Sequence, residues 1–324
     1  MKKIAITMGD PGGIGPEIVL MSLLSPLVRK CCSPVVIGDL SVMHETIDLL
    51  KLPLKIRAVD TPDDSRDSGK TIDLIDLAAC RMIPAHRPTA RGGNASVSYV
   101  KKAVALALSK KVDGIVTAPI SKEALKIAGF RWPGHTEMIA ELTRTKDYAM
   151  MLTGGPLRVI LVTIHTALKL VPSLITTQKV ARTLRLAHRA CTMLGIKKPR
   201  IAVAGLNPHA GEKGMFGDEE MKIIIPAVRR AAREGIPISG PYPPDTLFHK
   251  AYKGEVDMVV CMYHDQGLIP LKMIAFDKGV NVTVGLPFVR TSPDHGTAYD
   301  IAGKGIADPS SMIEAIMLAA RLRV

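Results

Sequence analysis

The sequence is poor in aromatic residues and has no C-x-x-C pair of cysteines. Phe, Tyr and Trp make up only 4% of its 324 residues, so the chain lacks the aromatic surface on which proteins stack single-stranded nucleic acid. Five cysteines are an odd number without metal-site spacing, which fits neither a disulfide framework nor a zinc finger. We therefore expect a protein of the reducing cytoplasm.

Long hydrophobic runs are also missing. The longest apolar stretch without a charged residue covers 18–28 and contains Pro26, whereas a membrane-spanning helix needs about 20 apolar residues. We expect no membrane span and no membrane partner. The length and the 47% hydrophobic content are sufficient for the cores of two domains.

Acidic residues are outnumbered, 30 against 43 Lys and Arg, which gives a net charge of +13. Such an excess could attract nucleic acid, an anionic membrane or a phosphorylated small molecule. The densest basic stretch, 179–200, has seven Lys/Arg and no acid, but its apolar residues repeat at helical spacing: Val180, Leu184, Ala187 and Cys191. This pattern favours a solvated helix face over a nucleic-acid surface.

Short β-branched runs alternate with longer segments of helical pattern. The predicted strands are 3–7, 35–38, 114–117, 157–164, 200–206, 256–263 and 281–284. Runs such as 159–162 and 258–261 are apolar at every position, which is typical of parallel strands buried on both faces. The sequence therefore predicts an α/β fold with helices on both sides of the sheet.

A glycine-rich turn, G-D-P-G-G-I-G-P-E at 9–17, follows the first predicted strand. Its glycines do not have the G-x-G-x-x-G spacing of a dinucleotide-binding turn. Two interpretations stay open. The turn is purely structural, or its backbone N–H groups and the following helix N-terminus approach an anionic or polar ligand.

Three histidines lie just beyond predicted strand ends: His165, His209 and His264. The carboxyl ends of strands in an open α/β sheet line the ligand crevice, so these imidazoles could converge. Three neutral imidazoles would leave coordination positions of a divalent metal open for substrate oxygens. A single histidine would be no more than a hydrogen-bonded or exposed side chain, but the shared position of all three favours a metal site. Zinc, cobalt, nickel, manganese and magnesium all remain candidates.

Two carboxylates lie in polar segments near these histidines. Asp245 in P-P-D-T and Asp265 in Y-H-D-Q-G could each orient an imidazole, or could only cap a turn. A further cluster, G-H-T-E at 134–137, contacts a ligand or starts a helix with Thr136 as its N-cap.

Lys272, Asn281 and Arg290 precede a segment rich in Gly and Pro. Lys and Arg with Asn are suited to holding carboxylate or phosphate, and Arg can do so with two parallel hydrogen bonds. Each residue alone would be a surface side chain. Together, after His264, they indicate one anion-binding site.

These motifs together resemble the 4-hydroxythreonine-4-phosphate dehydrogenase family of pyridoxal phosphate biosynthesis. The resemblance runs nearly end to end and is carried by G-D-P-G-G-I-G-P-E-I, G-H-T-E, G-L-N-P-H-A-G-E, P-D-T-L-F, M-Y-H-D-Q-G and G-L-P-F-V-R-T-S-P-D-H-G-T-A. Segments 9–17 and 295–304 also resemble isocitrate and isopropylmalate dehydrogenases.

The resemblance implies an isocitrate/isopropylmalate dehydrogenase-like fold of two α/β/α domains with a central cleft. Residues 1–118 and 276–324 would form the cofactor-side domain, and 119–275 the domain for metal, substrate and dimerisation. It also implies a homodimer in which one metal-binding histidine comes from the partner subunit.

Roles follow from the resemblance residue by residue. The metal ligands would be His165, His209 and His264, which with Lys272 and Asp245 form the catalytic set. The substrate contacts would be His135, Thr136, Lys272, Asn281 and Arg290. The NAD or NADP contacts would be Gly285, Asp294, His295, Gly296, Thr297 and Ala298.

The implied reaction is metal-dependent, NAD(P)-linked oxidation of 4-phosphohydroxy-L-threonine. The β-keto acid that forms would lose CO2 to give 3-amino-2-oxopropyl phosphate. One departure concerns the substrate, because this chain reads G-E-K-G-M-F-G at 211–217 where the biosynthetic enzyme reads G-E-G-G-H-M-G.

Paralogues that resemble this chain equally act in sugar-acid catabolism. They oxidise D-threonate 4-phosphate or D-erythronate 4-phosphate, with dihydroxyacetone phosphate as the product. Two readings from other classes are a basic nucleic-acid-binding protein with a degenerate enzyme fold and a metal-binding regulatory protein. A metal-binding regulatory protein would have no use for the anion-binding residues Lys272, Asn281 and Arg290.

Overall fold

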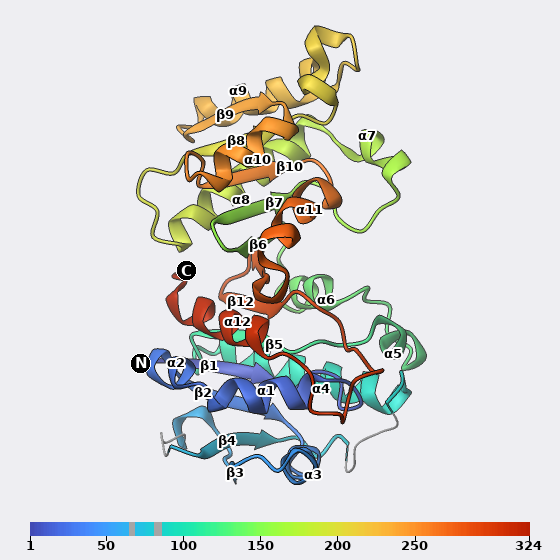
Figure 1. Ribbon diagram of the computed structural model, residues 1–324, viewed down its shortest axis with the longest axis vertical. Helices are drawn as coiled ribbons and strands as arrows, with labels where there is room; N and C mark the ends of the chain where they lie inside the picture. The colour runs from blue at the N-terminus through green and yellow to red at the C-terminus, as the bar shows by residue number, and fades with distance from the viewer. Residues whose placement is uncertain (65–68, 81–85) are drawn as a thin grey trace. The chain divides into compact units, whose positions relative to one another are not determined.

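The computed structural model describes residues 1–64, 69–80 and 86–324, which form two compact units (Figure 1). Unit 1 comprises 1–146, 286–322 and Val324, and unit 2 comprises 147–285 and Arg323. These units place 119–146 with the N-terminal segment and 276–285 with the middle of the chain, whereas the sequence predicts domain boundaries at 118/119 and 275/276. The reason is packing, because helices within 119–146 contact a helix of unit 1 and the strand within 276–285 pairs with unit 2.

Unit 1 contains a parallel sheet with the strand order β3-β4-β2-β1-β5-β12. Its strands are β1 (Lys2–Thr7), β2 (Cys32–Gly38), β3 (Lys55–Ala58), β4 (Thr71–Asp76), β5 (Gly114–Thr117) and β12 (Val289–Pro293). Its helices are α1 (Gly15–Leu24), α2 (Pro26–Cys31), α3 (Leu40–Leu50), η1 (Pro62–Asp64), α4 (Ala90–Leu108), α5 (Lys122–Ile127), α6 (His135–Leu142) and α12 (Ser310–Arg321). In Figure 1, α1 and α12 lie in front of this sheet and α4 behind it.

Unit 2 contains strands in the order β11-β6-β7-β10-β8-β9. They are β6 (Ala149–Gly154), β7 (Leu157–Leu161), β8 (Ile201–Ala204), β9 (Ile238–Tyr242), β10 (Met258–Cys261) and β11 (Val280–Val284). From β7 to β9 the neighbouring strands are parallel, whereas β6 is antiparallel to both β7 and β11. The α/β class is confirmed, and the antiparallel pairs are a difference from the expected parallel sheet.

The remaining helices belong to unit 2. They are η2 (Leu168–Leu170), α7 (Val171–Leu174), α8 (Thr177–Met193), η3 (Pro208–Gly214), η4 (Glu220–Ile224), α9 (Ile225–Arg233), α10 (Pro244–Tyr252), α11 (His264–Ala275) and η5 (Phe276–Lys278). In Figure 1, α10 and α11 lie in front of the sheet of this unit. Their side chains close a core cluster over β7 and β10 that includes Val159, Val259, Leu268 and Leu271.

The basic segment at 179–200 confirms the helical interpretation. The predicted apolar positions Val180, Leu184, Ala187 and Cys191 are all buried on α8. Basic residues on its other side pair within the protein, since Arg185 donates through Nε and Nη2 to the Glu234 carboxylate at 2.6 and 2.8 Å. The helix face is therefore a solvated and partly neutralised surface.

In the described parts of the chain, no helix combines the length and apolar character that crossing a membrane requires. None of the five cysteines, all of which the structure describes, forms a disulfide. Burial raises the pKa of Cys261 above its ordinary value of 9.0, which makes this thiol a packing residue rather than a nucleophile.

Candidate functional site

The three predicted histidines follow three adjacent strands. Strand β10 lies between β7 and β8 and is parallel to both, so the carboxyl ends of the three strands lie at one edge of the sheet. His165, His209 and His264 each come within five residues of one of these ends. This is the edge at which open α/β sheets bind ligands.

His165 and His264 lie close together at this edge. Their ring centroids are 5.5 Å apart, with 44° between the ring planes. His264 Nδ1 lies 2.7 Å from Asp265 Oδ1. A carboxylate can only accept this bond, so in the neutral ring Nδ1 carries the proton and Nε2 keeps its lone pair. Asp265 thus orients an imidazole, as one of the two sequence interpretations proposed.

His209 lines a pocket of about 380 Å³ together with Asp245, Tyr263, Asn207 and Gln266. Its ring centroid is 6.1 Å from that of Phe216. Within the described ranges of the single chain, no three metal-ligating side chains come together. One chain therefore brings His165 and His264 together and places His209 and Asp245 in this pocket wall. The metal ligand set stays a prediction.

The segment that carries His209 has a left-handed backbone. Five successive residues have positive φ: His209 at 52°, Ala210 at 53°, Gly211 at 81°, Glu212 at 40° and Lys213 at 54°. For residues with a side chain this conformation costs about 1–2 kcal/mol each. Such conformations persist only where surrounding contacts hold them, and they concentrate at functional sites.

Tyr263 and Glu220 were not singled out by the sequence. Tyr263 lines the pocket of His209, and burial raises its pKa above 10.0. Glu220 is buried and bonds to the chain just before His209. Tyr263 stands inside a recognised motif, Y-H-D-Q-G, so its position carried a signal. Glu220 is an acidic residue in an amphipathic helical segment, and an acidic residue in such a segment gives no sequence signal of a functional role.

In unit 1 a buried cation lies on β12. Arg290 is 2% exposed and donates through Nη2 to Thr117 Oγ1 at 2.7 Å. Burial lowers its pKa to about 10, so the guanidinium stays charged at neutral pH. Glu137 favours that charge electrostatically.

His135 is a neutral neighbour of this cation. Burial, and secondly the charge of Arg290, hold the pKa of His135 well below 6.5. Its Nε2 atom is buried, and no hydrogen-bond partner lies near it in the described structure. A buried polar atom without a partner costs about 1–3 kcal/mol, and a ligand that bonds to Nε2 would remove that cost.

Thr136 is buried in the first turn of α6, but it is not the N-cap. The helix begins at His135 with Gly134 in the cap position, so the alternative of a Thr136 cap is wrong. The N-terminus of α6 carries partial positive charge from its free N–H groups. His135, Thr136 and Arg290 therefore form a cluster that suits an anionic oxygen.

Lys272 and Asn281, also predicted as substrate contacts, belong to unit 2. Lys272 is on α11, with Nζ 5.6 Å from the centroid of the Phe276 ring. Asn281 is on β11, and its buried Oδ1 has no hydrogen-bond partner in the described ranges. Asn281 is thus a second buried polar group that a ligand could satisfy.

The predicted cofactor residues fall in two places. Gly285 directly follows β11 and has φ at +112°, and an added Cβ would overlap the Asp147 carbonyl oxygen. The rest belong to the segment after β12, where His295 and Gly296 are exposed and the Thr297 carbonyl accepts a bond from the Ile14 N–H at 2.9 Å. The other two members of the set are Asp294, whose N–H bonds to Ser311 Oγ at 3.2 Å, and Ala298, with φ at 41°.

The glycine-rich turn has its N–H groups engaged inside the protein. The Gly12 N–H donates to Asp10 Oδ1 at 2.9 Å, the Gly13 N–H to the Asp10 carbonyl at 3.0 Å, and the Ile14 N–H to Thr297. Glu17 is buried and accepts bonds from the N–H groups of Gly303 and Gly305. These bonds favour the structural interpretation of the turn.

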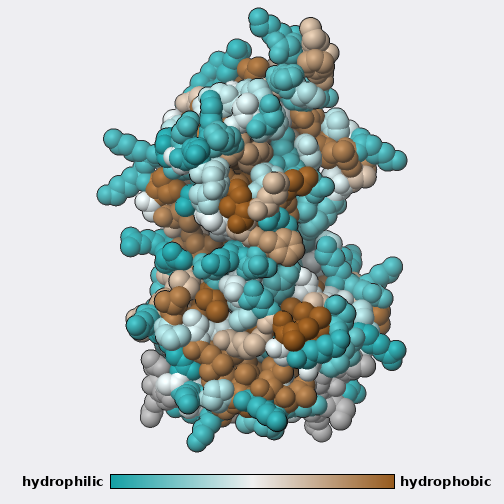
Figure 2. Space-filling model, viewed as in Figure 1, coloured by the Kyte–Doolittle hydropathy of each residue, from teal (hydrophilic) through white to brown (hydrophobic). Residues whose placement is uncertain are grey.

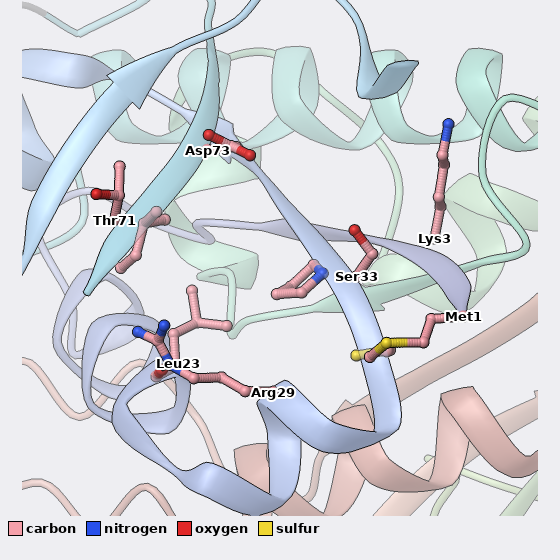
Figure 3. A pocket seen from close by; sticks show the side chains of 10 residues that line it. Met1, Lys3, Leu23, Arg29, Ser33, Thr71 and Asp73 are labelled. Atoms are coloured by element: carbon pink, nitrogen blue, oxygen red, sulfur yellow. Dashed lines mark hydrogen bonds between the residues drawn. The ribbon is translucent and has the colours of Figure 1, made fainter. Parts of the chain in front are cut away.

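A cavity of about 330 Å³ lies elsewhere in unit 1, at the amino ends of β1, β2 and β4 (Figure 3). Its charged side chains have partners: Arg29 Nε donates to the Leu23 carbonyl, and Asp73 pairs with Arg57 at 2.6 Å. None of the predicted site residues lines it. The strand edge where ligands are expected is the opposite one.

Comparison with known proteins places these features in a family. The model of the pyridoxal phosphate biosynthetic protein PdxA matches residues 30–319. The chain belongs to the PdxA family. The resemblance expected from the motifs is thereby confirmed.

Two similar relatives carry different names. A 4-hydroxythreonine-4-phosphate dehydrogenase of Desulforapulum autotrophicum is 51% identical over 98% of this chain and 94% of its own. A D-threonate 4-phosphate dehydrogenase of Cupriavidus necator is 48% identical over 98% of this chain and 96% of its own. The PdxA-family relatives therefore include two of the three dehydrogenases that the sequence left open.

Solved structures support the fold. The crystal structure of 4-hydroxythreonine-4-phosphate dehydrogenase from Klebsiella pneumoniae superposes with a TM-score of 0.91 at 44% identity, over 98% of both chains. An isocitrate dehydrogenase from Methylococcus capsulatus gives 0.50 at 15% identity, over 99% of this chain and 88% of that one. The isocitrate dehydrogenase-like fold is confirmed.

Proposed function

We propose that this PdxA-family protein is an NAD(P)-linked dehydrogenase that oxidises 4-phosphohydroxy-L-threonine in pyridoxal phosphate biosynthesis. D-threonate 4-phosphate is the second candidate substrate, which the name of the 48% identical relative favours. D-erythronate 4-phosphate is the third candidate. The observation that carries the proposal is the buried Arg290 cation beside neutral His135, whose Nε2 has no partner in the described structure. Such groups suit a substrate that carries both phosphate and carboxylate.

The histidines fit a divalent metal. His264 has Nδ1 on the Asp265 carboxylate and Nε2 available, and His165 lies beside it. We assign His165, His209 and His264 as ligands, with Asp245 near His209. A bound metal would supply Lewis-acid stabilisation to the substrate oxygen. The same donors accept zinc, cobalt, nickel or manganese and, with substrate oxygens added, magnesium.

The anion-binding residues hold the substrate by its charged ends. Arg290 keeps its charge at neutral pH because its pKa stays near 10, and neutral His135 and Thr136 complete hydrogen bonds to the same oxygens. Asn281 donates or accepts through its buried amide, and Lys272 provides a second cation. Holding both ends fixes the hydroxyl that is oxidised.

The segment 294–298, together with Gly285, contacts the nicotinamide cofactor in this proposal. Gly296 has open space where a side chain would begin, so a flat ring can approach its backbone. The cofactor, NAD or NADP, supplies the hydride acceptor. The resulting β-keto acid loses CO2 readily, and the Lys272 cation favours the negative charge that develops.

We propose a homodimer whose active site is shared across the interface. Exposed apolar residues gather on the elements next to the histidines: Leu168, Leu170 and Leu174 on η2 and α7, and Ile269, Met273 and Phe276 on α11 and η5. Met273 is 82% and Phe276 73% exposed. Brown side chains over α7 and α11 in Figure 2 show this apolar character. A second copy would cover such a surface and bring its own histidine near.

The free thiols support a cytoplasmic enzyme. The structure has no disulfide among its five described cysteines, which fits a reducing compartment. Arg185, on the most basic helix α8, pairs with Glu234 within the protein. This internal pairing argues against nucleic acid as a partner.

The test is NAD(P)H formation with 4-phosphohydroxy-L-threonine, D-threonate 4-phosphate and D-erythronate 4-phosphate, each with Co²⁺- or Zn²⁺-loaded protein. We expect a hundredfold or larger kcat/KM preference for the amino acid, which is roughly 2.7 kcal/mol of discrimination. Arg290→Ala should mainly raise KM. A preference for an aldonate phosphate would assign the catabolic reaction, and no turnover with any of the three would refute the proposal.

A further inference from the structure

A buried carboxylate lies beneath the left-handed turn that carries His209. Glu220 is 1% exposed and stands at the start of the π-helical turn η4. Its Oε1 accepts bonds from the backbone N–H groups of Leu206 at 2.7 Å and Asn207 at 2.8 Å. Its Oε2 accepts from Asn207 Nδ2 at 2.9 Å. The carboxylate therefore holds the chain just before His209.

The same carboxylate also limits the chain just after His209. A Cβ added to Gly211 would lie 2.6 Å from Glu220 Oε2. Gly211 has φ at +81°, so the turn passes over the carboxylate with no room for a side chain. Glu220 thus contacts the segment on both sides of His209.

The turn is also closed by three backbone hydrogen bonds, from the N–H groups of Ala210, Met215 and Phe216 to the carbonyls of Asn207, Glu212 and Gly211. Ala210, Glu212 and Lys213 have positive φ although their side chains disfavour it. Glu212 and Lys213 are exposed, so packing does not hold them. Charge-assisted bonds to backbone N–H groups are the strong kind of hydrogen bond, and π-helical turns recur at functional sites.

We propose that Glu220 is a positioning residue for His209, which holds the left-handed turn and so fixes where the imidazole points. The proposal rests on the proposed function in one respect, the assignment of His209 as a metal ligand. Groups that orient a metal ligand without touching the metal typically contribute 10–100-fold to metal affinity.

The test compares wild type with Glu220→Ala, Glu220→Gln and the control Glu219→Gln. Glu219 also accepts from Asn207 Nδ2, at 2.7 Å, but bonds to neither backbone N–H group. In Glu220→Gln the new amide oxygen can still accept the two backbone bonds, but the amide NH2 then faces the Asn207 amide. This variant should fold. Its trypsin cleavage rate and its Co²⁺ dissociation constant should lie between those of wild type and Glu220→Ala.

Two measurements distinguish an effect of Glu220 on the turn from an effect on metal binding. Without metal, trypsin cleavage after Lys213, followed by mass spectrometry, should be at least tenfold faster in Glu220→Ala than in wild type or Glu219→Gln. With Co²⁺ as the probe, the dissociation constant should rise about 10–100-fold, and the visible Co²⁺ spectrum of the saturated variant should change.

Each outcome decides a different claim. Unchanged cleavage in both Glu220 variants would overturn the role of Glu220 in holding the turn. Faster cleavage with wild-type Co²⁺ affinity and spectrum would reduce Glu220 to a structural residue and overturn the positioning role. Wild-type protein that binds no Co²⁺, with faster cleavage in Glu220→Ala, would refute the metal assignment of the proposed function and the positioning role while leaving the hold on the turn intact.

Discussion

Gly285 is the residue at which a structural role and a predicted cofactor role can be separated. Its φ of +112° is in a region that residues with a side chain rarely adopt. In Gly285→Ala the new methyl group would overlap the Asp147 carbonyl oxygen and lie 2.9 Å from Tyr148 Cα. Both neighbours are backbone atoms just before β6, which pairs with β11 through Val284 and Ala149. They cannot move aside without disturbing that pairing.

The cost has two parts. The strained φ costs about 1–3 kcal/mol, and overpacking a closed position costs about 1–3 kcal/mol more. The sum, about 2–6 kcal/mol, is a large fraction of the stability of a typical protein. At roughly 2–4 °C per kcal/mol, thermal unfolding followed by circular dichroism should show a midpoint lowered by roughly 4–24 °C.

Gly296→Ala is the matched control. Gly296 is another predicted cofactor contact, but nothing lies within 4 Å of its added Cβ and its φ is outside the positive range. We expect its midpoint to stay at the wild-type value, because such surface changes are usually within about 0.5 kcal/mol. Its KM for NAD(P) should rise if the segment binds the cofactor. A Gly285→Ala protein that unfolds at the wild-type temperature would refute the reasoning from backbone overlap.

Three further predictions concern the histidines and one buried acid. His209→Ala should lose turnover but unfold like wild type. The control His44→Ala, at an exposed helix position, should keep both wild-type turnover and wild-type stability. An active His209→Ala enzyme would contradict the metal assignment. Because one chain brings His165 and His264 together, verified mixed dimers of His165→Ala and His209→Ala chains should regain activity over either parent, and no recovery would argue against a shared site. Burial raises the pKa of Asp10 above 3.8, so the folded protein keeps this proton at pH values where the unfolded chain loses it. In urea unfolding, the free energy of unfolding of wild type should rise relative to that of Asp10→Asn as the pH falls from the folded-state pKa of Asp10 to its unfolded-state pKa. Parallel pH dependences of the two proteins would refute this prediction.

The sequence predicts what depends on local pattern. All seven predicted strands are present, although 157–164, 200–206 and 256–263 extend beyond the observed β7, β8 and β10. Apolar runs locate such buried strands, and polar residues after them locate the strand ends, so the histidine positions were predictable. Strands β3, β4, β6, β9 and β12 were missed, and each of them is only four to six residues long.

Features that depend on contacts distant in sequence were not predictable. Residues 209–213 include Ala, Glu and Lys, which give no signal for positive φ. The left-handed turn exists where Glu220 bonds to Leu206 and Asn207. Likewise, the low pKa of His135 results from its burial and from Arg290, far away in the sequence. The residue types were visible in the sequence, but the environments that set their chemistry were not.

The two segments that resemble isocitrate dehydrogenases, 9–17 and 295–304, form one structural unit. The Ile14 N–H bonds to the Thr297 carbonyl, and an added Cβ on Gly13 would lie 2.8 Å from that same oxygen. The Glu17 carboxylate accepts the N–H groups of Gly303 and Gly305. The lack of a side chain at Gly13 therefore allows the predicted cofactor residue Thr297 to lie against segment 9–17. Glu17 fixes the chain farther on, at Gly303 and Gly305. Each of the two motifs therefore supplies hydrogen-bond partners to the other.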